Sequence, residues 1–266
     1  MTLIEALTIG AIRGVTEVLP LGAAGHLALL PAPQATPDQM AATNLAANVG
    51  VLVALALYFW RDMAAMGVGL RKLAKGRPDP GARLFFHLLE GSVAAAVIAA
   101  PILILAGRAA GSMAIAATMA IFGLALLAAD YFGITVRRVT HLTHRGAIFL
   151  GALQAAALMP GVSRTGIVIT ALRLMGYERG EAARFSVLLA VPLVLASSVI
   201  SAWRLDRHGN IALSGDLLLV AVTAGLAALA AIAGMMAWLR RGTYGPFALW
   251  RIALGMGVMA MMAVRL

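Results

Sequence analysis

A short segment near the middle of the chain carries side chains that could bind a phosphate group. Residues 160–166 read PGVSRTG and come directly before an apolar stretch. Ser163 and Thr165 offer hydroxyl groups, Arg164 offers a guanidinium fork, and free backbone N–H groups at a helix start add further donors. The alternative is a tight turn in which Ser163 caps the next helix and Arg164 pairs with a carboxylate. These residues alone leave both interpretations open.

Few ionisable residues lie within the apolar parts of the sequence. A charge at membrane depth costs about 2.5–3.5 kcal/mol on insertion scales, so such a residue is a candidate for function. The candidates are Arg13, Glu17, His26, Glu90, Asp130 and Arg164. Glu90 and Asp130 fall near the ends of predicted spans, where a solvated or salt-bridged residue is the more common case. The other four fall on two interrupted apolar segments.

The elements that must position these residues are membrane helices. Of the 266 residues, 62% are hydrophobic and 12% are charged, and the mean hydropathy is +0.92. Soluble domains contain roughly 45–50% apolar and about 25% charged residues, so this composition excludes a water-soluble fold. Six apolar runs are long enough to cross a bilayer as helices. They lie at about 44–60, 84–107, 112–133, 182–203, 216–239 and 246–264.

Two further apolar stretches, about 3–31 and 146–177, are interrupted near their middles by proline, glycine and polar residues. Irregular backbone at membrane depth persists only where protein or a water-filled cavity satisfies its polar groups. The sequence therefore predicts an all-α membrane protein with six transmembrane helices and two re-entrant helix–loop–helix hairpins. We expect residues 1–266 to form a single membrane domain.

Basic residues recur in alternate connections between the predicted spans. They gather in the segments 61–83, 137–145 and 240–241. The positive-inside rule places these segments in the cytoplasm. The first interrupted stretch then enters from outside, and the second enters from the cytoplasm.

The two halves of the chain follow the same order of elements. Residues 1–133 and 134–266 each hold one interrupted stretch followed by three spans, with Pro20 and Pro160 at corresponding places. This order predicts an inverted-topology repeat, in which the two broken segments meet near the midplane and form the site.

Composition also limits the cofactors and partners. The chain has no cysteine, which excludes disulfides, thiolate metal sites and a cysteine nucleophile. The formal net charge is +10, but the basic residues are scattered between apolar spans and form no recognised nucleic-acid-binding module. We therefore expect membrane lipids with anionic headgroups as partners, and no nucleic acid.

The motifs around both interruptions resemble those of the undecaprenyl-diphosphate phosphatase, or bacitracin-resistance, family. Residues 154–166, QAAALMPGVSRTG, are similar to the family's second signature, approximately PG-x-SR-[ST]-G. Residues 16–20 and 25–27 resemble its first signature. Similar strings also fall at 48–60, 180–192 and 247–251, so the resemblance covers nearly the whole chain.

This resemblance implies a multi-pass protein of the bacterial inner membrane that binds a polyprenyl diphosphate from the outer side. It would hydrolyse the terminal phosphate and so recycle the lipid carrier of cell-wall synthesis. Arg164 would clamp the diphosphate, and His26 would act as general acid/base or nucleophile. Glu17 would orient His26 or hold Mg²⁺ or Ca²⁺. The further substrate-binding residues implied are Arg13, Gly25, Gly161, Ser163 and Thr165. The sequence leaves homodimer formation open.

The first signature departs from the family pattern at two places. The family usually has an acidic residue where this chain has Arg13, and hydroxyl residues where it has glycine and alanine at 22–24. Arg13 lies four residues before Glu17 on one helix face and could pair with it. Exchanging a carboxylate for a guanidinium predicts a site that favours anions and depends less on divalent cations.

The second departure limits the choice of nucleophile. Ala23 and Ala24 cannot attack phosphorus, which leaves His26, a hydroxyl of the second interruption, or water. Hydrolysis is the predicted function. One alternative is a transporter that moves a polyprenyl phosphate across the bilayer without hydrolysis, and another is an accessory protein of lipid-carrier metabolism.

Overall fold

The structure is a computed structural model that describes residues 2–27, 36–105, 111–207 and 215–264. It is all-helical, and six of the described helices are long and apolar enough to cross a membrane. They are α3 (Pro37–Tyr58), α5 (Pro80–Leu105), α6 (Ser112–Phe132), α9 (Arg179–Arg207), α10 (Gly215–Trp238) and α11 (Gly245–Ala263). The six predicted spans are therefore confirmed, and the chain is a multi-pass membrane protein.

Helix boundaries differ from the apolar runs where local capping extends a helix into polar sequence. α3 begins at Pro37, seven residues before the predicted run, because Thr36 and Gln39 form a capping box and Pro37 occupies the first turn. α9 likewise begins at Arg179, before its apolar run, and continues through Pro192 to Arg207. Hydropathy finds the apolar centre of a helix, whereas capping residues decide where it starts.

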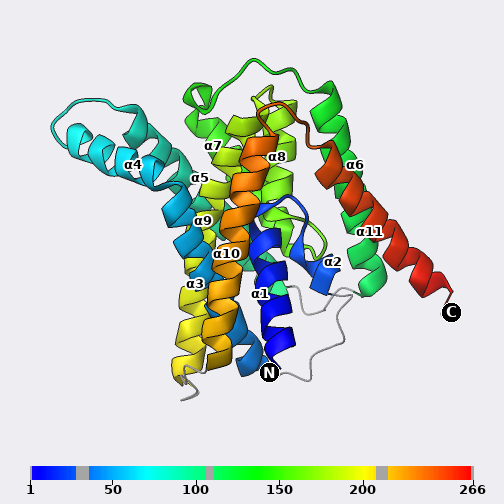
Figure 1. The fold of residues 1–266 in the computed structure, drawn as a ribbon. Coiled ribbons are helices and arrows are strands. Elements are labelled where there is room, and N and C mark those ends of the chain that lie inside the picture. The colour runs from blue at the N-terminus through cyan, green and yellow to red at the C-terminus, as the bar shows by residue number, and fades with distance from the viewer. Residues whose placement is uncertain (1, 28–35, 106–110, 208–214, 265–266) are drawn as a thin grey trace.

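The helices pack around α9 and α10. α1 (Leu3–Val18) and α3 both lie along α10, α9 packs on α3, and α6 pairs with α11 at one edge of the molecule (Figure 1). Gly14 lets α1 approach α10 closely, since a Cβ there would lie 2.2 Å from the carbonyl oxygen of Ala224. The position of α1 is thus set by backbone contact with a spanning helix.

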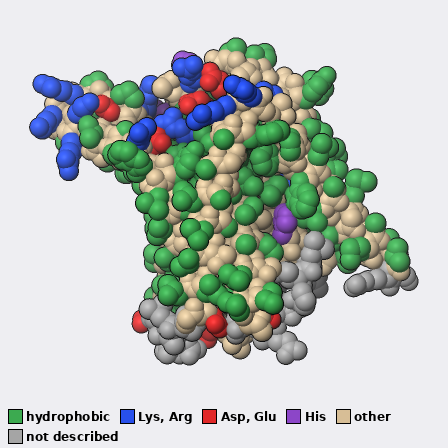
Figure 2. Space-filling model, in the orientation of Figure 1, with side chains coloured by type: hydrophobic (Ala, Val, Ile, Leu, Met, Phe, Trp, Pro, Cys, Tyr) green, Lys and Arg blue, Asp and Glu red, His purple; other side chains and the backbone are tan. Residues whose placement is uncertain are grey.

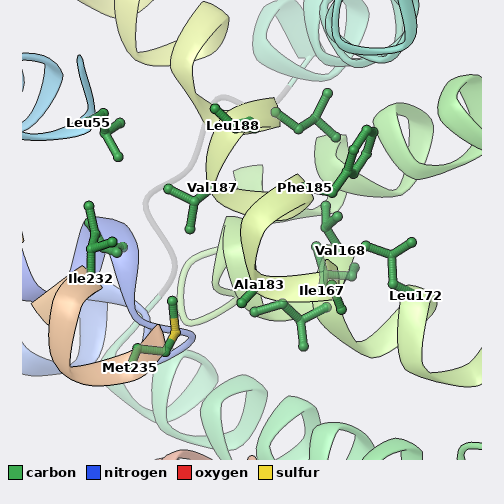
Figure 3. Packing of buried hydrophobic residues seen from close by; sticks show 14 of the residues in the cluster. Leu55, Ile167, Val168, Leu172, Ala183, Phe185, Val187, Leu188, Ile232 and Met235 are labelled. Atoms are coloured by element: carbon green, nitrogen blue, oxygen red, sulfur yellow. The ribbon is translucent and has the colours of Figure 1, made fainter. Parts of the chain in front are cut away.

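The buried core lies between α8 (Arg164–Leu174), α9, α3 and α10 (Figure 3). The side chains that meet there include Leu55, Val168, Phe185, Leu188 and Ile232. Large apolar side chains are also exposed along the outer faces of the spans, for example Ile121 and Leu226. An apolar exterior around an apolar core is the pattern expected of a protein whose solvent is lipid.

The basic connection after α3 is a helix, whereas the sequence analysis treated it as a linking segment. α4 (Trp60–Leu73) projects sideways from one end of the bundle and packs on α5 (Figure 1). Its basic residues keep its hydropathy below that of a span, so a search for apolar runs passes over it. Lys and Arg side chains gather at this end and on the projecting helix (Figure 2).

Both predicted interruptions are real breaks in helical structure. α1 ends at Val18, and α2 (Ala23–Leu27) follows after a short turn. In the second stretch, α7 (His144–Gln154) and the 3₁₀ turn η2 (Ala155–Leu158) are separated from α8 by residues 159–163. Both turns lie at mid-height of the bundle (Figure 1). The re-entrant path and the inverted repeat stay predictions, and residues 28–31 of the first stretch lie outside the described residues.

Candidate active site

The two interrupted segments meet through polar contacts. Arg164, the first residue of α8, forms an ion pair with Glu17, in the last turn of α1. The side chains of Arg164 and Glu17 are 28% and 18% exposed, so this ion pair is only partly removed from solvent. Thr165 Oγ1 donates to the carbonyl oxygen of Leu19 at 3.2 Å, which ties the same two segments together. The predicted convergence of the two breaks is thus present.

The two hydroxyl groups of the second break form a continuous hydrogen-bond chain. Gly166 N donates to Ser163 Oγ at 3.1 Å, and Ser163 and Thr165 hydroxyls lie 3.1 Å apart. Because the one Thr165 hydroxyl proton goes to Leu19, Ser163 must donate to Thr165. Both side chains are buried, at 3% and 1% exposure. In this arrangement neither hydroxyl has a proton left for a substrate oxygen.

The second break therefore has the features of the structural turn that the sequence left open as an alternative to a phosphate site. Ser163 caps α8 and Arg164 pairs with a carboxylate, as a structural turn requires. That carboxylate, however, belongs to the other interrupted segment, so the turn also assembles charged groups from both breaks. The capping interpretation and the phosphate-site interpretation are compatible.

Arg251 of α11 donates hydrogen bonds to both turns. It was not among the site residues predicted from the sequence. Its Nη1 donates to the carbonyl oxygen of Pro20 at 3.3 Å, and its Nη2 donates to that of Gly161 at 3.1 Å. The side chain is completely buried. Arg251 lies within the apolar run 246–264, so the rule that singles out charges at membrane depth could have found it.

His26 on α2 is held between two hydrogen bonds that fix its tautomer. Nδ1 lies 2.9 Å from the carbonyl oxygen of Gly22, an acceptor, so Nδ1 carries the proton. Trp250 Nε1, which can only donate, lies 2.9 Å from His26 Nε2, so Nε2 is an unprotonated acceptor. The two rings are also stacked, with centroids 6.2 Å apart. Trp250 thus holds the His26 ring in one orientation with its basic nitrogen at Nε2. Trp250 was not predicted from the sequence as a site residue.

The glycines of the two turns serve the backbone. Gly22 and Gly161 have φ values of +82° and +92°, a region that side chains with a Cβ rarely adopt. Gly161 also lies against α6, whose Thr118 donates to the carbonyl oxygen of Pro160 at 2.6 Å. Gly25 lets α2 approach α6, since a Cβ there would meet Met119 Sδ at 1.8 Å. The structure places Gly25 and Gly161 as packing and turn residues, and their contact with substrate stays a prediction.

Arg13 lies one turn before Glu17 on α1, but Glu17 forms an ion pair with Arg164. The suggested pairing of Arg13 with Glu17 is therefore replaced by a contact across the two segments. Arg13 Nε is buried and has no hydrogen-bond partner among the described residues, and the same holds for Arg251 Nε. The guanidinium groups of Arg164 and Arg251 contact the two segments, and Arg13 lies one helical turn before Glu17 on α1, a balance of charge that favours an anion.

The donor set suits a divalent cation poorly. Mg²⁺ sites use one or two carboxylates together with phosphate oxygens and water. Glu17 is already engaged by Arg164, and the position four residues earlier is a guanidinium. Within residues 2–27, 36–105, 111–207 and 215–264, His, Asp and Glu side chains form no group of three that could hold a metal ion.

The remaining ionisable candidates have polar partners, and Asp130 is salt-bridged near a span end, as expected. Asp130 Oδ1 accepts from Arg173 Nε at 2.9 Å and from Arg179 Nε at 2.7 Å, and Asp130 Oδ2 accepts from Tyr244 N at 2.7 Å. Glu90 Oε1 lies 2.8 Å from His144 Nδ1. Asp130, in the last turn of α6, links that helix end to α8 and α9, whereas Glu90 lies ten residues into α5 and contacts the first residue of α7.

Comparisons with known proteins agree on one family. A family model described as bacitracin resistance protein BacA matches residues 6–257. Undecaprenyl-diphosphatase 1 of Paramagnetospirillum magneticum is 49% identical over 261 residues, which cover 98% of each chain. Undecaprenyl-diphosphatase 1 of Rhodospirillum rubrum is 45% identical over 98% of this chain and 95% of its own. Undecaprenyl-diphosphatase of Ruegeria pomeroyi is 38% identical over 96% of this chain and 97% of its own.

Proposed function

Because the chain belongs to the bacitracin resistance protein BacA family, we propose that it hydrolyses undecaprenyl diphosphate to undecaprenyl phosphate and inorganic phosphate. This reaction recycles the lipid carrier of cell-wall synthesis. The observation that carries the proposal is the meeting of Glu17 and Arg164 from two separate breaks in helical structure. The names of the relatives favour hydrolysis over transport without hydrolysis.

Arg164 is the group proposed to bind the diphosphate. A phosphate oxygen competes with the Glu17 carboxylate for the guanidinium, and the remaining N–H groups of the fork reach a second oxygen. As the phosphoryl group transfers, negative charge spreads over its oxygens and is stabilised by this fixed cation. Arg13, whose buried Nε has no hydrogen-bond partner in the part of the chain that the structure describes, adds positive charge on the neighbouring turn of α1.

His26 is proposed as the general base for attack by water. Its Nε2 carries the free electron pair, and release of the Trp250 N–H exposes that pair to a water molecule. The water oxygen forms a bond to the terminal phosphorus, and its proton moves to His26 Nε2. The bond from this phosphorus to the bridging oxygen breaks, and undecaprenyl phosphate leaves. Water is favoured over Ser163 and Thr165 as nucleophile, since both hydroxyl protons are engaged.

Two finer expectations belong to this proposal. The basic end of the bundle would face the cytoplasm of the inner membrane, which opens the site toward the outer leaflet. Turnover would depend only weakly on Mg²⁺ or Ca²⁺. The support for the second expectation is the engagement of Glu17 by Arg164 and the guanidinium at position 13.

The deciding experiment is phosphate release by the purified full-length protein from undecaprenyl diphosphate in detergent. The assay is run with Mg²⁺, with Ca²⁺ and with chelator, and His26→Gln is the matched inactive variant. We expect release in all three conditions and none from the variant. Protein that releases no phosphate but moves undecaprenyl phosphate between the leaflets of vesicles would replace hydrolysis with transport.

A further inference from the structure

Two cavities lie one after the other between α4, α5 and α9, away from the candidate active site. The first, of about 160 Å³, is lined by Asp62, Arg83, His87, Thr140 and Arg184 among others. The second, of about 150 Å³, is lined by apolar residues of the same three helices, including Met66, Phe85, Leu188 and Val191. On α9 the linings lie on one face, with Leu188 and Val191 one to two turns deeper than Arg184.

The polar cavity offers hydrogen-bond donors for an anion. Arg83 is exposed at its mouth, and its Nη2 donates to the carbonyl oxygen of Thr140 at 2.9 Å, a neutral acceptor that leaves its charge uncompensated. His87 is 1% exposed, and its Nε2 has no hydrogen-bond partner among the described residues. The neutral imidazole tautomer that carries its proton on Nε2 donates a hydrogen bond to a ligand in the cavity.

The carboxylates near the polar cavity are already engaged. Asp62 pairs with Arg184, and Glu181 lies 3.4 Å from Arg184 Nη1 and accepts from Val139 N at 3.0 Å. Glu90 faces His144. The charge of Arg184 is therefore balanced by protein, whereas Arg83 forms no ion pair with the described carboxylates and can pair with a ligand.

The position of the cavities indicates what kind of anion reaches them. Their linings come from α4, α5 and α9, and the apolar cavity is lined by Leu188 and Val191, farther along α9 than Arg184. α4 projects sideways at the basic end of the bundle (Figures 1 and 2). Lys72 Nζ and Gly81 N each donate to Asp79 at 2.8 Å, which links the last turn of α4 to the start of α5, and these hydrogen bonds hold the pKa of Asp79 below its ordinary value. A polar cavity followed by an apolar one, both lined in part by a basic helix, matches a lipid with its headgroup at the membrane surface.

We propose that the cavities between α4, α5 and α9 form a binding site for an anionic membrane phospholipid. Its phosphate contacts Arg83 and His87, and one acyl chain enters the cavity lined by Met66 and Leu188. The nearby basic residues of α4 add attraction for anionic headgroups in the same leaflet. This site is separate from the two turns at Glu17 and Arg164, and it stands whether or not the chain hydrolyses undecaprenyl diphosphate.

The test uses phosphatidylglycerol as probe and the full-length protein. Native mass spectrometry counts the lipids retained by wild type, by Arg83→Gln and by Arg240→Gln, a control with the same charge change at an exposed position of the same end. Losing one charge-assisted contact predicts about tenfold weaker retention for Arg83→Gln and little change for Arg240→Gln. Equal loss in both variants would show general surface attraction and overturn the site.

A second measurement locates the acyl chain. Phosphatidylglycerol with a photoreactive group on one acyl chain is cross-linked to the wild-type protein, and labelled peptides are identified. Labelling at Met63, Met66 or Phe85 supports the site, and labelling spread evenly over the spans contradicts it. Undecaprenyl phosphate that displaces phosphatidylglycerol from these residues at equal concentration would also contradict it, since the cavities would then serve the lipid carrier.

Discussion

Helix α8 carries two arginines with opposite surroundings. At its C-terminal end Arg173 is completely buried, and its guanidinium donates to Asp130, Thr135, Tyr177 and Gly133. At its N-terminal end Arg164 is partly exposed, and its recorded partner among the described residues is the Glu17 carboxylate. A guanidinium whose donors are all satisfied by protein stabilises the fold, whereas one with donors to spare can bind a ligand.

The largest expected effect follows from removing Asp130, the carboxylate partner of the fully hydrogen-bonded Arg173. Asp130→Ala leaves Arg173 buried without its counter-charge and should cost about 3–5 kcal/mol of unfolding free energy. Denaturant titration of the purified protein in detergent measures this loss. Asp62→Ala is the control at Arg184, which is 33% exposed and keeps Glu181 as a second carboxylate partner, so it should cost much less, about 0–1 kcal/mol. A smaller loss for Asp130→Ala than for Asp62→Ala would refute the structural role assigned to Arg173.

Arg164→Lys tests the other end of the same helix. A point charge cannot replace the bidentate fork, so we expect phosphate release to fall by about 10²–10³ with little change in melting temperature. Arg173→Lys should show the reverse, with a lowered melting temperature and nearly normal turnover per folded molecule. Unchanged kcat and KM in Arg164→Lys would remove Arg164 from the site.

Trp250→Phe probes how His26 is held. Phenylalanine keeps an aromatic ring beside His26 but has no N–H for Nε2, so the Nδ1–H tautomer loses one neutral hydrogen bond and should fall about fivefold relative to the other tautomer. Trp60→Phe, on α4, is the control. Nitrogen-15 NMR spectra of His26 should show a smaller population of the Nδ1–H tautomer in Trp250→Phe than in the wild type, and no change in Trp60→Phe. A variant with normal turnover and an unchanged tautomer would contradict the role of Trp250.

The smallest effect concerns the departures in the first break. Arg13→Glu combined with Ala23→Ser restores a second carboxylate and a hydroxyl, so both turnover and its response to Mg²⁺ or Ca²⁺ should rise several-fold. Wild-type protein assayed with and without chelator is the reference. If chelator abolishes turnover in the wild type, the charge balance inferred from Arg13 and Glu17 is wrong.

The sequence predicted the parts of this protein that depend on local composition. Apolar length located the six spans. Pro20 and Pro160 located the breaks because each stands among glycine and polar residues, whereas Pro192, within an apolar run, lies inside α9. Charge near a span end predicted the salt bridges of Asp130. The same reasoning passed over α4, whose helix is amphipathic and packs on α5, because hydropathy alone does not separate such a helix from a linker.

Only the tertiary structure decided how the candidate site is assembled. Helix geometry placed Glu17 and Arg13 on one face, but packing brought Glu17 to Arg164 on another element. Arg251 and Trp250 reach the two turns because α11 lies against α6, a contact between segments far apart in the chain. The repeated order of elements predicted that the two breaks meet, but which side chains touch there depends on how whole helices pack, which local sequence spacing does not determine.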